Sequence, residues 1–350
     1  MKKINRFKVL FVFMSLSFLC GCWDIKEIDQ RALPLTIGIS KGNDEEYKLT
    51  LQISMSKKES KKSRIVTVKG DSVSSVLGQM RMHSEKAVDY SHIRLIIIQN
   101  NLAKNKEQLS EIIKFLMTSK EIPSRALLAI TDDNIEKSLS NINDKLGVNA
   151  TSIYDYFKKG AGWAPEVSSI SIWEVYRSLT SYTKDIAIPV VSSGQDTVLN
   201  YEGSAVLKNG KMTGRISPNE SQLINLFQNH SANGKIESLG FASIMVTSSS
   251  IQNKTSMKSS MPLVSSDLNL KIEILERKEG MTKNEIQKEL EKLIEKRFYH
   301  LFEQAQESHT DIFGFGQYFR HQISYQELKD WREEYYPKLN VNFQVKAIIE

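Results

Sequence analysis

Cysteine is almost absent from this chain of 350 residues, because Cys20 and Cys22 are its only two. The single residue between them does not fit the C-x-x-C spacing of zinc and redox sites, and no second cysteine pair could complete such a site. Long apolar runs are also scarce. After the first 19 residues, no apolar stretch approaches the roughly 18 residues that a membrane-spanning helix needs, so we expect no later span.

The first 19 residues have the layout of a secretory signal peptide. The basic residues Lys2, Lys3, Arg6 and Lys8 precede the apolar run Val9–Leu19. As a helix this run would be only about 16 Å long, too short for an ordinary membrane crossing. A buried core helix is the alternative, but the run has no polar face and follows a basic terminus. We therefore expect export.

The segment Leu19–Cys22 resembles the bacterial lipobox, with leucine three positions before Cys22 and glycine directly before it. In that signal the thiol is joined to diacylglycerol and the leader is cut off before the cysteine. Cys20 does not fit, because the bulky Leu19 would occupy the small position. The resemblance implies that residues 1–21 are removed and that Cys22 is the lipid attachment site, since two acyl chains anchor a protein stably.

The net charge of +6 comes from 47 basic and 41 acidic residues, but four of the basic residues lie in the leader. The mature chain keeps 43 basic residues, a net charge of +2. This balance does not favour nucleic acid as a partner. The basic run Lys57–Arg64 is expected to be a solvated loop, and contact with anionic lipid head groups is the alternative.

In the first half, apolar spacing predicts alternating strands and helices. Strands are predicted over 33–40, 46–55, 65–68, 92–100 and 125–131. Three amphipathic helices are predicted from residues that would face inward: Val73, Val76, Leu77 and Met80 in the first, Leu109, Ile112, Ile113 and Leu116 in the second, and Ile172, Val175, Tyr176 and Leu179 in the third. A further helix is expected directly after the strand 125–131, with Asp132 or Asp133 as its cap. The strand 186–193 carries Pro189, which predicts a sheet edge.

In the second half, Asn209-Gly210 predicts a hairpin turn and Ser217 the start of a helix. The polar stretch 251–262 is expected to be a loop or linker. A capping box from Thr282 to Glu285 starts a helix of about 25 residues, for which Leu293 is one of the expected inward residues. A strand is predicted at the end of the chain, near 339–350.

These patterns predict an α+β protein with two or three small domains of mixed or antiparallel β-sheets flanked by helices, after the N-terminal lipoprotein signal peptide. The expected divisions are a signal peptide over 1–21, an α/β domain over 22–195 and an α+β domain over 196–350, with a further division considered near 250–265. The stretch 192–200 is predicted to contain the interdomain boundary.

The sequence offers no constellation for catalysis or metal binding. The histidines form no H-E-x-x-H motif, and G-x-S-x-G is absent. His309 and Asp311 are read as polar loop residues and not as metal ligands. The pair Gly314 and Gly316 lacks the third glycine of a nucleotide loop, so no nucleotide site is expected there. Instead, Asp311 is expected to cap a short helix whose aromatic residues pack on the core. We expect no enzyme and no cofactor.

Several segments, in order along the chain, resemble the Ger(x)C spore germination lipoproteins, the C subunits of GerA-type nutrient germinant receptors. They are Cys22-Trp-Asp-x-x-Glu-Ile28, SHIRLIIIQNNLAKNK (91–106), YEGSAVLKNGKMTGRISPNESQLINLF (201–227) and DIFGFG (311–316) before a tryptophan helix and a last apolar strand. No catalytic residue of that family carries over to this chain.

The resemblance implies a subunit anchored on the outer face of the bacterial cytoplasmic, or inner spore, membrane. Its partners would be the lipid bilayer, through Cys22, and two integral-membrane subunits, a permease-like B-type and an A-type. Trp23, Asp24, Glu27 and Ile28 are candidates for contact with a partner or the membrane; Trp23 could equally rest against lipid head groups. Whether the subunit binds a nutrient itself is left open.

A lipid-anchored solute-binding protein is the alternative function. Such a protein would need two doubly wound lobes with a ligand cleft between them. The hairpin-rich second half, with its long capped helix, does not favour that architecture.

Overall fold

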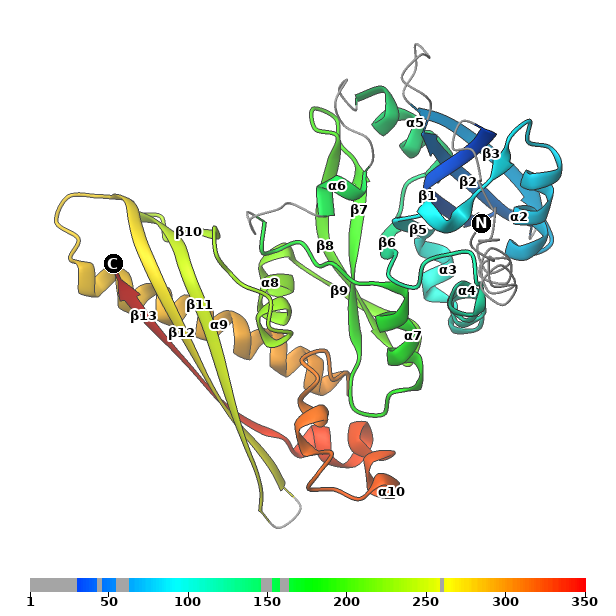
Figure 1. Ribbon diagram of the computed structural model, residues 1–350. Coiled ribbons are helices and arrows are strands. Elements are labelled where there is room, and N and C mark those ends of the chain that lie inside the picture. Colours follow the sequence, from blue (N-terminus) through cyan, green and yellow to red (C-terminus); the bar gives the residue numbers. More distant parts are fainter. Residues whose placement is uncertain (1–29, 43–45, 55–62, 146–152, 158–163, 259–260) are drawn as a thin grey trace, which may run out of the picture.

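The computed structural model describes residues 30–42, 46–54, 63–145, 153–157, 164–258 and 261–350. Two β-sheets with helices packed on them lie toward opposite ends of a bent, elongated molecule (Figure 1). The predicted fold class, α+β with mixed sheets flanked by helices, is therefore confirmed. The predicted signal peptide lies outside the described residues.

The first sheet has nine strands among the described residues, in the order β3-β2-β1-β5-β6-β7-β8-β9, with β4 beside β1. Their bounds are β1 (Arg31–Lys41), β2 (Tyr47–Ser54), β3 (Ser63–Gly70), β4 (Ala87–Val88), β5 (Leu95–Gln99), β6 (Leu127–Thr131), β7 (Ile186–Ser193), β8 (Leu199–Lys208) and β9 (Lys211–Ile216). Strands β1, β5, β6 and β7 are parallel to one another, and the strands on either side are antiparallel.

Helices cover both faces of this sheet, which is why its central strands are apolar along both faces. Side chains such as Ile96 and Ile98 pack with α2 (Val73–Met82), α3 (Asn100–Lys104), α4 (Lys106–Thr118) and α7 (Ile172–Thr180). The alternate residues, such as Leu95 and Ile97, pack with α5 (Ile135–Lys145) and α6 (Tyr154–Phe157). The buried residues of α2 and α4 are the inward residues that the sequence predicts.

The predicted cap of α5 is wrong. Asn134 accepts the hydrogen bond from the Lys137 amide at 3.0 Å and so caps the helix. The carboxylate of Asp132 pairs with Arg215, and that of Asp133 accepts from the Ser193 amide at 2.8 Å. Both aspartates are used in tertiary contacts that the local pattern does not reveal.

The predicted edge position of β7 is also wrong, because β7 lies between β6 and β8. Pro189 has no N–H to donate to a neighbouring strand. The pairing with β8 shifts register between Pro189 and Val191, and β6 contributes a single bridge from Ile130 to Val190. A bulge and sparse pairing on the other side thus accommodate the proline inside the sheet.

The predicted hairpin between β8 and β9 is confirmed. Asn209 and Gly210 both have positive φ, 50° and 79°, as a type I′ turn requires. The helix α8 (Pro218–Phe227) follows with the predicted start, because Ser217 and Glu220 form a capping box. The predicted domain boundary between 195 and 196 falls between β7 and β8, two strands that pair with each other; it stays a prediction.

The second sheet has the order β10-β11-β12-β13, with bounds β10 (Ile236–Ser238), β11 (Ala242–Lys258), β12 (Met261–Arg277) and β13 (Asn340–Ile349). The prediction of a loop or linker over 251–262 is wrong. The pairing of β11 and β12 continues through this polar stretch as far as Lys258 and Met261. Backbone pairing does not require apolar side chains, and much of this stretch faces solvent on one side.

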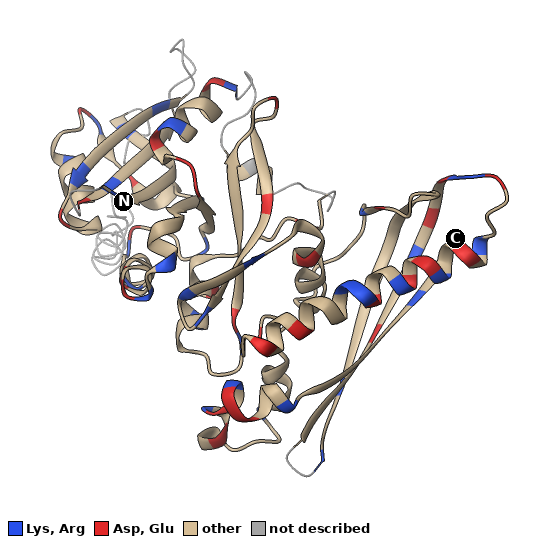
Figure 2. Ribbon diagram, turned by 180° about the vertical axis from the view of Figure 1, so that it is seen from behind, with Lys and Arg blue, Asp and Glu red and all other residues tan. Residues whose placement is uncertain are grey.

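A single long helix, α9 (Lys283–Glu307), runs along this sheet (Figures 1 and 2). It begins with the predicted capping box of Thr282 and Glu285. Acidic and basic residues alternate along its outer side (Figure 2). The buried side is apolar, and it includes Ile294, whereas the predicted Leu293 is only half-buried.

The second core is rich in phenylalanine and is closed by the segment between α9 and β13. The rings of Phe298 and Phe343 stack with centroids 4.1 Å apart. The closing segment contains the short helices η3 (Phe315–Phe319), α10 (Tyr325–Leu328), η4 (Trp331–Tyr335) and η5 (Tyr336–Lys338). Ala187, Val206 and Ile216 of the first sheet belong to the same core, so the two sheets share a continuous interior.

Candidate functional site

The site residues predicted from the sequence lie outside the described residues. They are Cys22, Trp23, Asp24, Glu27 and Ile28. The lipid attachment and the contact role therefore stay predictions. No helix of the described part of the chain is both long and apolar enough to cross a membrane.

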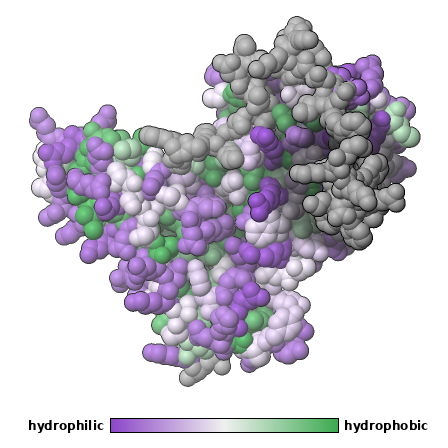
Figure 3. All heavy atoms as spheres, viewed as in Figure 1, coloured by the Kyte–Doolittle hydropathy of each residue, from purple (hydrophilic) through white to green (hydrophobic). Residues whose placement is uncertain are grey.

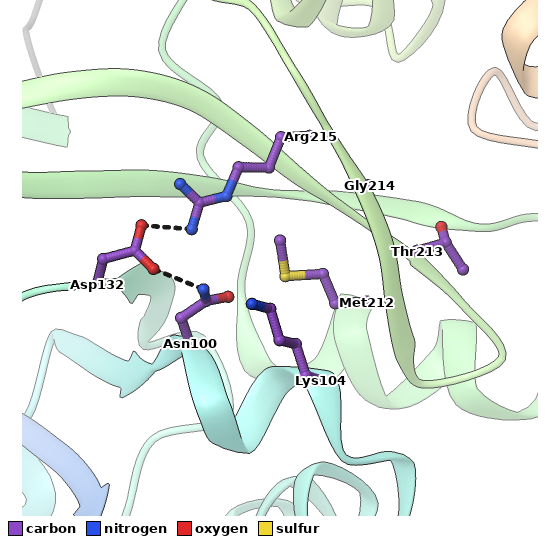
Figure 4. Close-up of a pocket in the computed structure, with 7 residues that line it drawn as sticks. All are labelled: Asn100, Lys104, Asp132, Met212, Thr213, Gly214 and Arg215. Atoms are coloured by element: carbon purple, nitrogen blue, oxygen red, sulfur yellow. Dashed lines mark hydrogen bonds and ion pairs between the residues drawn. The ribbon is translucent and has the colours of Figure 1, made fainter.

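A polar pocket of about 420 Å³ lies where β5 and β6 end, next to β9 (Figure 4). Its lining residues are Asn100, Lys104, Asp132, Met212, Thr213, Gly214 and Arg215. Asn100 directly follows β5 and Asp132 directly follows β6, so the parallel pairing of these strands brings the two side chains to one edge. This carboxyl edge is where α/β sheets commonly bind ligands.

The polar groups of the pocket form a short chain of contacts. The Asn100 amide nitrogen donates to the Asp132 carboxylate at 2.5 Å, and Arg215 binds the other oxygen of that carboxylate. The buried carbonyl oxygen of Asn100 has no hydrogen-bond partner among the described residues. The side chain of Lys104, one helical turn after Asn100, extends into the same space (Figure 4).

This arrangement can bind a small polar ligand through the charges of Lys104, Asp132 and Arg215. Its lining residues include one hydroxyl group, that of Thr213, and no histidine to activate it. The geometry of this pocket therefore supports the binding of a small polar molecule. The sequence analysis did not predict this pocket. The polar residues Asn100 and Asp132, each directly after a predicted buried strand, could have indicated it.

A second polar cluster is buried where the two sheets meet. The carboxylate of Asp185, which precedes β7, accepts from Nε and Nη2 of Arg332 at 2.9 and 2.8 Å. The Asp311 amide donates to the Asp185 carboxylate at 2.8 Å, and the Asp185 amide donates to the Asp311 carbonyl oxygen at 2.9 Å. Asp185 is fully buried and Arg332 is 5% exposed. This cluster joins the start of β7 to the segment before β13.

Asp311 caps the short helix η3, as the sequence predicts. Its carboxylate accepts from the amides of Phe315 and Gly316 at 2.9 and 2.7 Å, and from Nε1 of Trp331 at 2.9 Å. Burial raises the pKa of Asp311 to about 7, against the opposing effect of these hydrogen bonds. The Gly314–Gly316 segment thus serves packing, because a Cβ at Gly316 would lie 2.6 Å from the Trp331 ring.

The outer edge of β13 is covered by side chains of α9. The amides of Ala347 and Val345 donate to the carboxylates of Glu291 and Glu295 at 2.9 and 3.0 Å. The Phe343 amide donates to the hydroxyl of Tyr299 at 3.0 Å. Alternate residues of a strand and every fourth residue of a helix advance by a similar length, about 6 Å, so one helix face follows the strand edge.

No group of three or more His, Cys, Asp or Glu that could hold a metal is found in the described part of the chain. His309 and Asp311 do not share a site, because Nδ1 of His309 lies 2.7 Å from Glu333 while Asp311 contacts backbone amides and Trp331.

On the face seen in Figure 3, hydrophobic residues appear as small groups among hydrophilic ones.

Two family models match the chain. Residues 24–193 match the spore germination protein N-terminal domain, and residues 202–350 match the C-terminal domain described as spore germination B3/GerAC like. Together the two models span nearly all of the chain that follows the predicted leader.

Curated relatives from Bacillus subtilis (strain 168) carry spore germination names. Spore germination protein KC is 24% identical, over 97% of this chain and 94% of its own length. Spore germination protein A3 is 25% identical and protein B3 24%, over 66% and 64% of this chain. The chain spans only 63% and 61% of the lengths of A3 and B3.

A solved structure has the same fold. The crystal structure of the GerBC protein matches with a TM-score of 0.55 and 15% identity, over 89% of this chain and 96% of that one.

Proposed function

Because the chain belongs to the spore germination family whose N- and C-terminal models it matches, we propose that it is a lipid-anchored, non-enzymatic subunit of a spore nutrient germinant receptor. The observation that carries this proposal is the match of both models, in order, over 24–193 and 202–350. The lipobox-like Leu19–Cys22 ends two positions before Asp24, the first matched residue, which supports anchoring through Cys22.

The proposed partners are two integral-membrane subunits, a permease-like B-type and an A-type. The proposed location is the outer face of the inner spore membrane, because an exported lipoprotein is held there by its acyl chains. The names of the relatives A3, B3 and KC are consistent with subunits of several related receptors. Within the described residues the structure offers binding surfaces and a pocket, and we assign it no chemical step.

The alternative is a lipid-anchored solute-binding protein, and the polar pocket at Asn100 and Arg215 is the observation that favours it. The described residues do not form two doubly wound lobes, because the second sheet is antiparallel except for the pair β12 and β13. Calorimetry with amino acids and sugars separates the two functions. Tight binding by the purified chain, without any membrane partner, would favour the solute-binding protein.

Affinity isolation from spores tests the proposed function directly. A tagged chain, isolated from detergent-solubilised spore membranes, should bring down two integral-membrane proteins in a fixed proportion. Deletion of the chain should remove the response to at least one nutrient, and the wild-type sequence should restore it. Isolation of the chain alone, together with an unchanged response to every nutrient, would overturn the proposal.

A further inference from the structure

Exposed basic residues gather at the amino-terminal ends of the parallel strands in the first sheet. We call this surface the basic edge and define it by Lys86, Arg94, Lys120 and Arg125. Lys86 directly precedes β4, Arg94 directly precedes β5, and the other two lie in the connection from α4 to β6. All four side chains are exposed, and none forms an ion pair with another residue in the described part of the chain.

Strand pairing places these residues at one side of the sheet. The first two residues of β1, Arg31 and Ala32, pair in parallel with β4. The first residue of β5, Leu95, pairs with Leu127, the first residue of β6. The amino-terminal ends of these parallel strands therefore lie together, although β1 and β4 extend further than β5 and β6.

Acidic residues do not neutralise the basic edge. Asp89 is held by Arg31 and Glu121 is held by Arg81, which leaves Glu85 as the exposed acid of this surface without an ion pair among the described residues. The opposite, carboxyl-terminal edge carries Asp132 and Asp133 instead. Asp132 is paired there with Arg215, and Lys104 lies beside them, so the excess of unpaired basic residues distinguishes the amino-terminal edge.

Two exposed apolar side chains accompany these charges. Met82, at the end of α2, is 75% exposed, and Trp173, at the start of α7, is 39% exposed. The Trp173 amide donates to the carbonyl of Ser124, next to Arg125. Tryptophan and basic residues together are typical of surfaces that meet a membrane interface.

The start of β1, at Arg31, lies at this same edge and follows the predicted anchor Cys22 closely in the sequence. Eight residues separate Cys22 from Arg31, and nine backbone steps span at most about 32 Å. A lipid on Cys22 therefore keeps the start of β1 within that distance of the head groups. Ser54 pairs with Ser63 and with Leu33, so the described residues on either side of 55–62 also lie near this edge. Residues 55–62 lie outside the described residues and are not part of the surface.

We propose that the basic edge binds the anionic head groups of the membrane that holds the anchor, with Met82 and Trp173 at the interface. This inference rests on the proposed lipid anchor and adds a second, electrostatic contact to it. Each basic residue near an anionic membrane strengthens binding about fivefold. The first sheet would then face the bilayer with its basic edge, which leaves the second sheet directed toward other partners.

Vesicle co-sedimentation of the unacylated protein tests this contact. The mature chain carrying Cys22→Ser is mixed with vesicles of phosphatidylcholine alone, or of phosphatidylcholine with phosphatidylglycerol. We expect binding to the anionic vesicles only, weakened by high salt. Absence of binding to anionic vesicles, or equal binding to both kinds, would overturn the proposal; the first result would point to an acidic protein partner instead.

A matched pair of charge-reversed variants locates the contact. The variant Lys86→Glu/Arg94→Glu/Arg125→Glu should lower the binding constant at least 100-fold. The control is Lys254→Glu/Lys292→Glu/Lys346→Glu, which changes three exposed lysines of the second sheet and α9 by the same charge. An equal loss in both variants would overturn the proposal. Because no spore is involved, failure here is distinct from failure of the receptor proposal.

Discussion

Asp185 and Arg332 lie 147 positions apart in the chain and form a buried, two-point ion pair, with N–O distances of 2.9 and 2.8 Å. Asp185 lies within the region that matches the N-terminal family model, and Arg332 within the C-terminal one. Arg332 also donates to the carbonyl of Ser181 at 2.8 Å. The two matched regions are thus joined by a buried charged contact, and they should unfold together.

Removal of one partner from this pair should be costly. Arg332→Leu leaves the Asp185 carboxylate buried without its counter-charge, and we expect a loss of about 3–5 kcal/mol in the free energy of unfolding. The control is Lys338→Ala, which removes an exposed pair with Glu334 and should cost less than about 1 kcal/mol. Urea denaturation measures both. Similar losses in the two variants would contradict the structural role of the buried pair.

The raised pKa of Asp311, about 7 against an ordinary value of 3.8, makes stability depend on pH. The folded chain holds this proton more tightly than the unfolded chain does. Asp311 therefore contributes most to stability below about pH 4, and this contribution is lost as the pH rises toward 7. The slope between these limits should be roughly 1.4 kcal/mol per pH unit at most.

The variant Asp311→Asn isolates this dependence, because asparagine cannot titrate. Wild-type stability should fall relative to the variant between pH 4 and pH 7, on top of a constant difference from the altered hydrogen bonds to Phe315 and Trp331. Urea denaturation across this range checks the prediction. A difference that stays constant with pH would show that Asp311 is ionised throughout.

Two glycine substitutions should have opposite effects. Gly316→Ala places a Cβ 2.6 Å from the Trp331 ring and should destabilise the protein by about 1–3 kcal/mol. Gly78→Ala is the control, because Gly78 lies inside α2 and a Cβ there meets nothing within 4 Å. Alanine favours the helix, so a gain of about 0.5–1 kcal/mol is expected. Thermal unfolding of both variants distinguishes close packing from a general intolerance of substitution.

The side chains that cover β13 should suppress self-association. In the double variant Glu291→Ala/Glu295→Ala, the amides of Ala347 and Val345 lose their acceptors, and the strand edge becomes available to a second copy. Light scattering should then show concentration-dependent association. The control Glu289→Ala/Glu303→Ala removes two exposed carboxylates of the same helix. If both variants behave alike, net charge and not edge protection explains the effect.

Local patterns predicted much of this fold. The buried faces of α2 and α4, the turn at Asn209-Gly210 and the capping box at Thr282 follow from spacing within a few residues. Each depends on neighbours in sequence, so the sequence alone contains the information.

The errors have a common physical origin in contacts between distant segments. The polar stretch 251–258 is a strand because β12 supplies its backbone partners, and Pro189 is tolerated inside the sheet because of a bulge. The pair of Asp185 and Arg332 has no local signature at all. The positions of Asn100 and Asp132 directly after two buried strands could have indicated the pocket. Arg215 lies on β9, three strands away from β6 in the sheet order, so no local pattern connects it with them.

Lipid anchoring at Cys22 is the central claim, and the substitution Cys22→Ala in spores tests it most directly. The wild-type chain should remain in the inner-membrane fraction, whereas the variant should appear in the soluble fraction, with a reduced response to the receptor's nutrient. Fractionation and germination are scored separately. A variant that stays membrane-bound and germinates normally would contradict anchoring through Cys22.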